Sequence, residues 1–164
     1  MLLGRSHGFS LFVARSDTRV DLYESHSGER HRRDVWSEEV DPEISRVERV
    51  TLHKIGPSRI VEVFECLNGT GGCYQEFLAW SPGVDCRAVD HVRDKFNAAL
   101  PRPLTTLKAP IADLDAMTIR GNGWKPSACN ACPSLEMTCR LTFDGDAFHL
   151  SKCAVKSIDQ GQRK

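Results

Sequence analysis

Apolar and polar residues alternate most regularly near the C-terminal end of the chain. Between residues 135 and 143, odd-numbered positions are apolar and even-numbered positions are polar, which predicts a half-buried β-strand. The Asp-Gly-Asp segment at positions 144–146 is typical of a turn. Phe148 and Leu150 then resume the alternation, so the whole segment is expected to form a hairpin with Cys139 on its apolar face.

A second β pattern begins at Val47. Apolar positions continue to Ile55, the turn-forming segment Gly56-Pro57-Ser58 interrupts them, and a run of apolar residues follows up to Phe64. This arrangement predicts another hairpin. The stretch that follows, up to position 86, is rich in Gly and holds three cysteines, which indicates a strand, a loop closed by disulfides and a returning chain.

One segment has the spacing of a helix rather than a strand. Five apolar residues between positions 85 and 100 fall on one helical face, and Asp85 can cap the first turn; these residues are Val89, Val92, Phe96, Ala99 and Leu100. Prolines and glycines over residues 101–126 predict a loop region. Within it Trp124 is either an exposed receptor anchor or a buried plug, and burial is favoured.

Residues 15–49 carry many charges and show almost no apolar periodicity, so we expect this stretch to be weakly ordered. It contains Arg30, His31, Arg32 and Arg33 in succession. An exposed basic tract is where a proprotein convertase binds and cuts, which would place cleavage after Arg33. A solvated charged loop or a small phosphate-binding patch is the alternative.

Two domains follow from this interpretation. Residues 1–33 would be a charged leader or propeptide, and residues 34–164 would form a cysteine-rich β-hairpin domain. The N-terminal segment is a weak signal peptide, because Arg5 and His7 interrupt its apolar residues. Asn68-Gly69-Thr70 is a glycosylation sequon, which supports secretion only weakly.

Composition narrows the classes of function. The chain has 164 residues, with 22 Lys and Arg against 22 Asp and Glu, so charge gives no case for binding to nucleic acid or to an anionic membrane. No apolar run reaches the ~18 residues of a membrane-spanning helix, so membrane insertion is not expected. No set of residues indicates a catalytic mechanism, and the chain is expected not to be an enzyme.

The seven cysteines are the outlier in the composition; they are Cys66, Cys73, Cys86, Cys129, Cys132, Cys139 and Cys153. In a secreted protein they would be a disulfide framework that ties the hairpins together. The odd number leaves one thiol, which implies either a covalent homodimer or a free buried cysteine. Sequence alone does not fix which cysteines pair.

The spacing around the first cysteines resembles a known family. Cys66-Leu67-Asn68, four further residues and Cys73, with Arg59-Ile60-Val61-Glu62 before and Cys86 after, resemble the central cysteines of Spätzle-type and neurotrophin-type cystine-knot cytokines. The resemblance covers mainly residues 47–86. It implies a secreted, growth-factor-like proprotein that is cut at a basic site, forms dimers and binds a receptor ectodomain. The expected fold is mainly β with one helix, built from disulfide-stapled hairpins in a cystine-knot-like arrangement, without a cofactor.

Two other interpretations stay open. In a cytoplasmic protein Cys129-x2-Cys132, with Cys139 and Cys153 or with His149, would form a zinc site in a small α+β binding module. A thioredoxin-like redox pair at Cys129 and Cys132 is less favoured, because the chain continues into a strand instead of a helix. Alternatively, the loop over residues 70–74 is similar to the S-G-x-x-Y loop of bacterial lysozyme inhibitors, with Thr in place of Ser.

Overall fold

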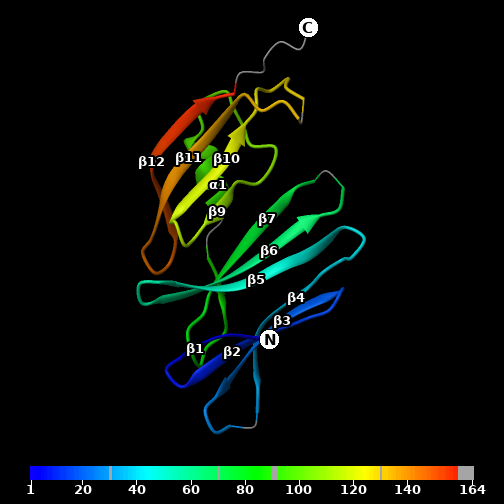
Figure 1. Ribbon diagram of the computed structural model, residues 1–164, viewed down its shortest axis with the longest axis vertical. Coiled ribbons are helices and arrows are strands. Elements are labelled where there is room, and N and C mark those ends of the chain that lie inside the picture. Colours follow the sequence, from blue (N-terminus) through cyan, green and yellow to red (C-terminus); the bar gives the residue numbers. More distant parts are fainter. Residues whose placement is uncertain (30, 70, 90–91, 130, 159–164) are drawn as a thin grey trace. The chain divides into compact units, whose positions relative to one another are not determined.

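The computed structural model describes residues 1–29, 31–69, 71–89, 92–129 and 131–158. The chain folds as two compact units, an N-terminal unit of residues 1–89 and a C-terminal unit of residues 90–164. The fold is mainly β, with three antiparallel sheets and one short helix in the described residues (Figure 1). The compact units divide after position 89; the boundary predicted at position 33 concerns a processing site and stays a prediction.

Four consecutive strands form the first sheet of the N-terminal unit. They are paired in the order β1-β2-β3-β4, each antiparallel to the next. Short turns join β1 to β2 and β2 to β3, as in a simple meander. Their bounds are β1 (Leu2–Ser6), β2 (Phe9–Arg15), β3 (Arg19–His26) and β4 (Arg33–Glu39).

The expectation of weak order over residues 15–49 is wrong for the described part of this stretch. β3, β4 and the start of β5 lie within it. Val20 and Leu22 are 1% and 0% exposed, and the third inward position of β3 is Glu24 at 2% exposure. The inward face of β3 therefore consists of two apolar residues and one buried acid. Because the third position is charged, the sequence pattern did not indicate a strand here.

The second sheet of the N-terminal unit contains the predicted hairpin. It pairs in the order β5-β6-β7-β8, and Gly56 turns the chain with a φ of +57°, where glycine has no steric penalty. Cys66 lies directly opposite Cys73. The bounds are β5 (Ser45–Ile55), β6 (Ser58–Leu67), β7 (Cys73–Ala79) and β8 (Arg87–Ala88).

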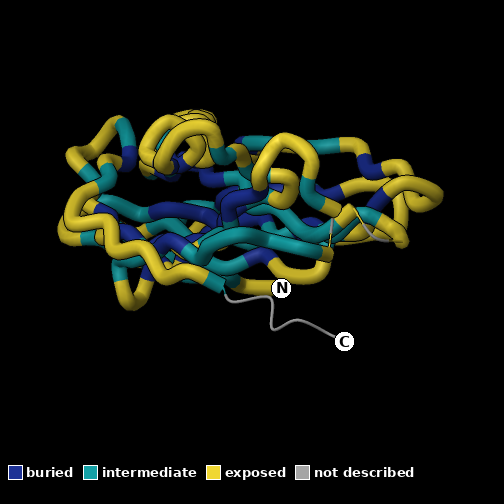
Figure 2. The backbone as a smooth tube through the Cα atoms, turned by 90° about the horizontal axis from the view of Figure 1, so that it is seen from above, coloured by how far each residue is buried: buried dark blue, intermediate teal, exposed yellow. Residues whose placement is uncertain are grey.

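The two sheets of the N-terminal unit share one hydrophobic core. Buried positions lie mainly along the strands, while most described turns and the N-terminal residue are exposed (Figure 2). The first sheet and the segment after it contribute Leu11, Val13, Val20, Leu22, Val35 and Val40. The second sheet and the residue that follows β7 contribute Val50, Val61, Val63, Leu78 and Trp80.

The C-terminal unit is one sheet with a helix against it. The strands pair in the order β12-β11-β10-β9, and the hairpin predicted over residues 135–150 is confirmed. A bulge shifts its register between Thr138 and Arg140, and Lys152 on β12 has a φ of +47°. The elements are α1 (Val92–Ala99), β9 (Ile111–Asp113), β10 (Thr118–Gly123), β11 (Leu135–Phe143) and β12 (Phe148–Ser157).

The predicted helix is confirmed but is shorter than expected. The described helix starts at Val92, and Asp85 makes an ion pair with Arg33 instead of capping it. Phe96 on α1 is fully buried. A Cβ atom added to Gly121 on β10 would lie 3.0 Å from a carbon of the Phe96 ring, so the helix packs against a strand position that has no side chain.

The region over residues 101–126 is more ordered than the loop that was predicted. It contains β9 and β10, and Trp124 is 2% exposed, which confirms the prediction of a buried plug. Its Nε1 has no hydrogen-bond partner among the described residues. No helix in the described part of the chain is long and apolar enough to cross a membrane.

Candidate interaction surface

Six of the seven cysteines form three disulfides: Cys66–Cys73, Cys129–Cys132 and Cys139–Cys153. The partners are separated by 7, 3 and 14 positions in the sequence, so each bond closes a local loop within one unit. Two bonds that join the same pair of segments would be needed to close the ring of a cystine knot, and these three pairs do not provide them. The disulfide-stapled hairpins are therefore observed, whereas the knot is not.

The four thiols of the alternative zinc site are all used in disulfides. Cys129 pairs with Cys132, and Cys139 pairs with Cys153. Zinc requires cysteine as the free thiolate, so this pairing does not fit a zinc ligand set. Among the described residues, no group of three or more His, Cys, Asp or Glu side chains is arranged to hold a metal ion.

Cys86 is the cysteine without a disulfide partner. It is half-buried, and burial, together with the charges of Glu24 and Asp85, raises the pKa of its thiol to about 12. The thiolate is the form that attacks another sulfur atom, so little of the reactive form exists near neutral pH. This environment favours a free structural cysteine over the intermolecular bond that the odd cysteine count suggested.

The basic tract proposed for processing is partly built into the sheet. Arg30 lies outside the described residues. Arg32 lies over two aromatic rings, and Arg33 donates hydrogen bonds to Glu24 at 3.0 Å and to Asp85 at 2.7 Å. Cleavage after Arg33 stays a prediction, but release of residues 1–33 would remove three of the four strands of the first sheet.

The sequon asparagine is also engaged by the fold. Asn68 is exposed, and its Nδ2 donates hydrogen bonds of 3.0 Å to the carbonyl oxygens of Pro42 and Glu43. A glycan on Nδ2 would leave a single N–H for these two acceptors. Thr70, which completes the sequon and starts the inhibitor-like loop, lies outside the described residues.

A surface that the sequence analysis missed lies on the outer face of the first sheet, defined here as the side of β2, β3 and β4 turned away from the core. Strand alternation sends Leu11 and Leu22 inward, so Phe12 and Tyr23 point outward. These two residues lie opposite each other in the register, with rings stacked at a centroid distance of 5.5 Å and an interplanar angle of 11°. The stack is only partly buried.

Arg32 covers this stack. Its guanidinium carbon is 4.8 Å from the ring centre of Tyr23 and 5.5 Å from that of Phe12. Its Nη1 also donates a hydrogen bond of 3.1 Å to the Tyr23 hydroxyl. The combination fixes a planar cation over aromatic faces, which is a favourable geometry. We call Phe12, Tyr23 and Arg32 the aromatic–arginine cluster.

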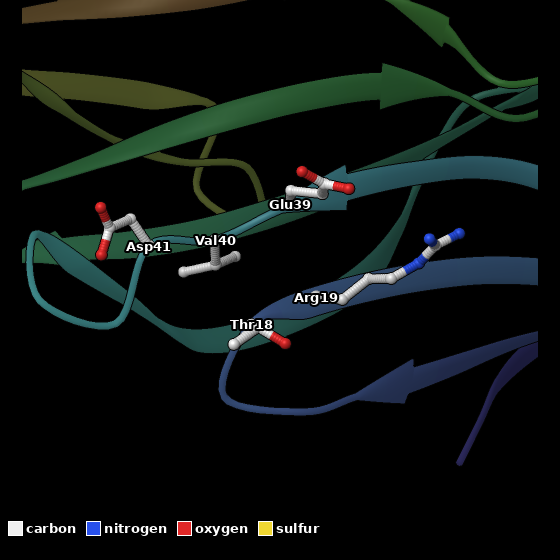
Figure 3. A pocket seen from close by; sticks show the side chains of 5 residues that line it. All are labelled: Thr18, Arg19, Glu39, Val40 and Asp41. Atoms are coloured by element: carbon white, nitrogen blue, oxygen red, sulfur yellow. The ribbon is translucent and has the colours of Figure 1, made fainter.

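Two depressions share Arg19, and the first of them includes Tyr23 and Arg32 of the cluster. The first, of about 380 Å³, is lined by Ala14, Arg19, Asp21, Tyr23, Arg32 and Asp34. The second, of about 480 Å³, is lined by Thr18, Arg19, Glu39, Val40 and Asp41 (Figure 3). In the second depression Arg19 and Glu39 are paired across neighbouring strands.

The single cation of the second depression is already neutralised. Arg19 Nε lies 2.6 Å from Asp21 Oδ1. This hydrogen bond is the largest of the effects that raise the pKa of Arg19, and Glu39 adds to it. The carboxylates of Glu39 and Asp41 thus give the depression an excess of negative charge.

Elsewhere in the N-terminal unit, one buried carboxylate, that of Glu62, has a structural role. Glu62 on β6 is 3% exposed and accepts hydrogen bonds from Arg49, His53 and Gln75 at 2.8, 2.8 and 2.7 Å. Burial opposes the charge of Glu62, but these partners outweigh it and lower the pKa to about 2. The site is fully occupied by protein groups, which is typical of a structural ion network.

Glu38 is the contrasting case. Its Oε2 is buried and has no hydrogen-bond partner among the described residues. Burial, with the nearby charges of Glu76 and Glu65, raises the pKa of Glu38 to about 7. The same surroundings raise the pKa of Tyr74, mainly through burial and its hydrogen bond to Glu65. Neither depression described above is lined by Glu38.

The surface on β2, β3 and β4 combines two half-buried aromatic rings, an arginine over them and an acidic depression. Its components come from these strands, whose register had not been anticipated, and from the segments that flank them, and only Arg32 had been singled out in the sequence. No protein family model matches the chain, and no curated protein or solved structure shows a match to it. Functional inference therefore rests on the residues of this chain.

Proposed function

We propose that the protein is a secreted, disulfide-stabilised binding protein that recognises another protein through the outer face of its first sheet. The observation that carries this proposal is the aromatic–arginine cluster of Phe12, Tyr23 and Arg32, two residues of which line one polar depression that shares Arg19 with a second. Aromatic residues and arginine are the types that contribute most to protein–protein binding energy. The cluster is pre-organised, so less side-chain entropy is lost on binding.

The chemistry of the surface indicates what the partner presents. An excess of carboxylate in the depression of Figure 3 favours a lysine or arginine side chain of the partner. The half-buried Phe12 and Tyr23 rings, with the Arg32 guanidinium over them, favour apolar or aromatic groups beside that charge. A receptor ectodomain, as the resemblance to cystine-knot cytokines implied, is one partner of this kind.

The disulfides support a location outside the cytosol. Three disulfide bonds in a chain of this size are typical of oxidising compartments and rare where glutathione keeps thiols reduced. The half-buried site of Cys86, with its raised thiol pKa, argues for a non-covalent association if the protein dimerises.

A photo-crosslinking experiment can identify the partner and test the surface together. A benzophenone amino acid replaces exposed Ala14, which lines the first depression, or exposed Thr142 in the C-terminal unit as the control. The labelled full-length proteins are applied to intact cells and to extracellular fluid of the source. A protein captured from position 14 and not from position 142 is then purified.

Affinity measurements with that purified protein decide the proposal. Tyr23→Ala and Arg32→Ala should each weaken binding by about tenfold or more, the size expected of a central contact. Arg140→Ala, an exposed substitution in the C-terminal unit, should change the affinity by less than about twofold. Capture from position 142 alone, or equal affinities for all three variants, would overturn the proposal.

A further inference from the structure

One of the three disulfides has no evident role in holding the fold. Cys129–Cys132 spans three positions in the sequence and lies in the loop between β10 and β11. A backbone hydrogen bond from Ser134 N to Gly123 O at 2.8 Å already closes the neck of this loop, and two further bonds of 2.9 and 3.1 Å tie its first residue, Trp124, to Thr105. The disulfide therefore closes a small ring inside a loop that is closed without it.

The other two disulfides lie within the sheets. Cys66 and Cys73 face each other across β6 and β7, and Cys139 joins β11 to β12 at the bulge, with its side chain 1% exposed. Restriction of the unfolded chain grows with the length of the closed loop, and the loop between Cys129 and Cys132 is the shortest of the three. Reduction of this bond would leave every strand pair in place.

The bond is also open to attack at one of its sulfur atoms, because Cys129 is exposed while Cys132 is half-buried. Cys66 and Cys73 are both half-buried, and in the third pair Cys153 is exposed but its partner Cys139 is buried. An external thiolate can therefore approach the Cys129 sulfur. A turn holds the second cysteine close, because Cys132 N donates a hydrogen bond of 2.9 Å to Cys129 O.

We propose that Cys129 and Cys132 form a redox-active disulfide that accepts two electrons from a dithiol of another protein. Exposed disulfides in Cys-x-x-Cys sequences are the labile and catalytic ones, while enclosed disulfides resist reduction. Strand β11 follows the motif here; a helix in that place lowers the pKa of the thiol but is not required for exchange. This inference is independent of the binding surface on the N-terminal unit.

The exchange proceeds in two balanced steps. A thiolate of the partner attacks the Sγ of Cys129, which forms a mixed disulfide and releases Cys132 as a thiolate that takes up a proton. The second thiolate of the partner then attacks its own sulfur in the mixed disulfide and displaces Cys129, which also takes up a proton. One dithiol is oxidised to a disulfide for each protein molecule reduced.

The test uses the oxidised full-length protein and a peptide that contains two cysteines. The reaction is stopped with acid, thiols are alkylated, and each cysteine pair is followed by mass spectrometry. Cys129–Cys132 should be reduced at least tenfold faster than either other disulfide, with the circular dichroism spectrum unchanged. One equivalent of peptide disulfide should form. Reduction in step with the other pairs, or only after unfolding, would overturn the proposal, and so would the absence of oxidised peptide.

Variants separate chemistry from folding. The double variant Cys129→Ser/Cys132→Ser should keep the spectrum and the melting temperature but oxidise no peptide. With oxidised glutathione as the probe, the Cys132→Ser protein should form a mixed disulfide on Cys129 at least tenfold faster than the Cys129→Ser protein forms one on Cys132. Equal rates would contradict the assignment of Cys129 as the attacked sulfur, and a double variant that still oxidises the peptide would exclude this pair.

Discussion

The two units of the chain bury their apolar residues in different ways. In the N-terminal unit two sheets cover each other and share one core, with one disulfide at the end of a hairpin. In the C-terminal unit a single sheet packs against an eight-residue helix and carries two disulfides. Small apolar cores are commonly supplemented by covalent links, and the Cys139–Cys153 bond fits that role in the smaller unit.

The two buried tryptophans show the same difference. Trp80 in the N-terminal unit donates from Nε1 to Glu24 at 3.2 Å, and Glu24 also accepts from Gly83 N at 3.1 Å and from Arg33. Trp124 in the C-terminal unit has no partner for Nε1 among the described residues. The buried tryptophan of the N-terminal unit is thus held by a hydrogen bond to a buried acid, whereas that of the C-terminal unit is buried without one.

The largest expected effect comes from the helix of the C-terminal unit. Phe96→Ala should destabilise this unit by about 3–5 kcal/mol, because it removes a fully buried ring and leaves a cavity. Leu78→Ala, also at 0% exposure, is the matched variant in the N-terminal unit. Hydrogen exchange measured segment by segment should show that each variant loses protection only in the unit that carries the substitution. Loss of protection in both units from either variant would mean that they unfold together.

Removal of one disulfide from each unit should show which unit loses more stability without its covalent link. Cys139→Ala/Cys153→Ala should cost about 3 kcal/mol and Cys66→Ala/Cys73→Ala about 2.5 kcal/mol, since the stabilisation grows slowly with loop length. Denaturant midpoints for each unit provide the measurement. A larger loss from the pair in the N-terminal unit would show that its hairpin depends on the covalent bond more than the C-terminal sheet does.

The smallest expected effect is a pH dependence of stability that arises from Glu38 in the N-terminal unit. The pKa of Glu38 is about 7 in the folded protein against a usual 4.5, so the folded state holds the extra proton between these values. The stability of the N-terminal unit should therefore fall as pH rises from 5 to 8, by about 1–2 kcal/mol after allowance for solvent access. Thermal melts of Glu38→Gln should lack this slope, whereas an unchanged slope would assign it to another group.

Local patterns of apolar and turn-forming residues were sufficient to predict the hairpins over residues 47–66 and 135–150 and the helix. They failed for the first sheet, because the inward face of β3 includes Glu24, whose partner Trp80 lies 56 positions away. A buried acid of this kind looks like a surface charge in the sequence. Its environment is created by the tertiary fold, which local periodicity does not contain.

The candidate site was missed for a related reason. Phe12 and Tyr23 meet only if the turn after β2 sets the register that pairs them, and a charged stretch gave little sign of that turn. The disulfide pairs likewise depend on which strands lie side by side, as with Cys66 opposite Cys73. Counting cysteines indicated a framework, but spacing alone did not assign its bonds.

The bulge in β12 has a consequence for how the protein behaves at high concentration. β12 is the edge of its sheet, and unpaired edges are templates for the growth of intermolecular sheets. Here the left-handed backbone at Lys152 interrupts the flat edge, and exposed Lys152 and Lys156 place positive charge along it. Copies of the chain that approach through β12 would repel each other, so this edge is protected against fibril formation even though Val155 is 56% exposed.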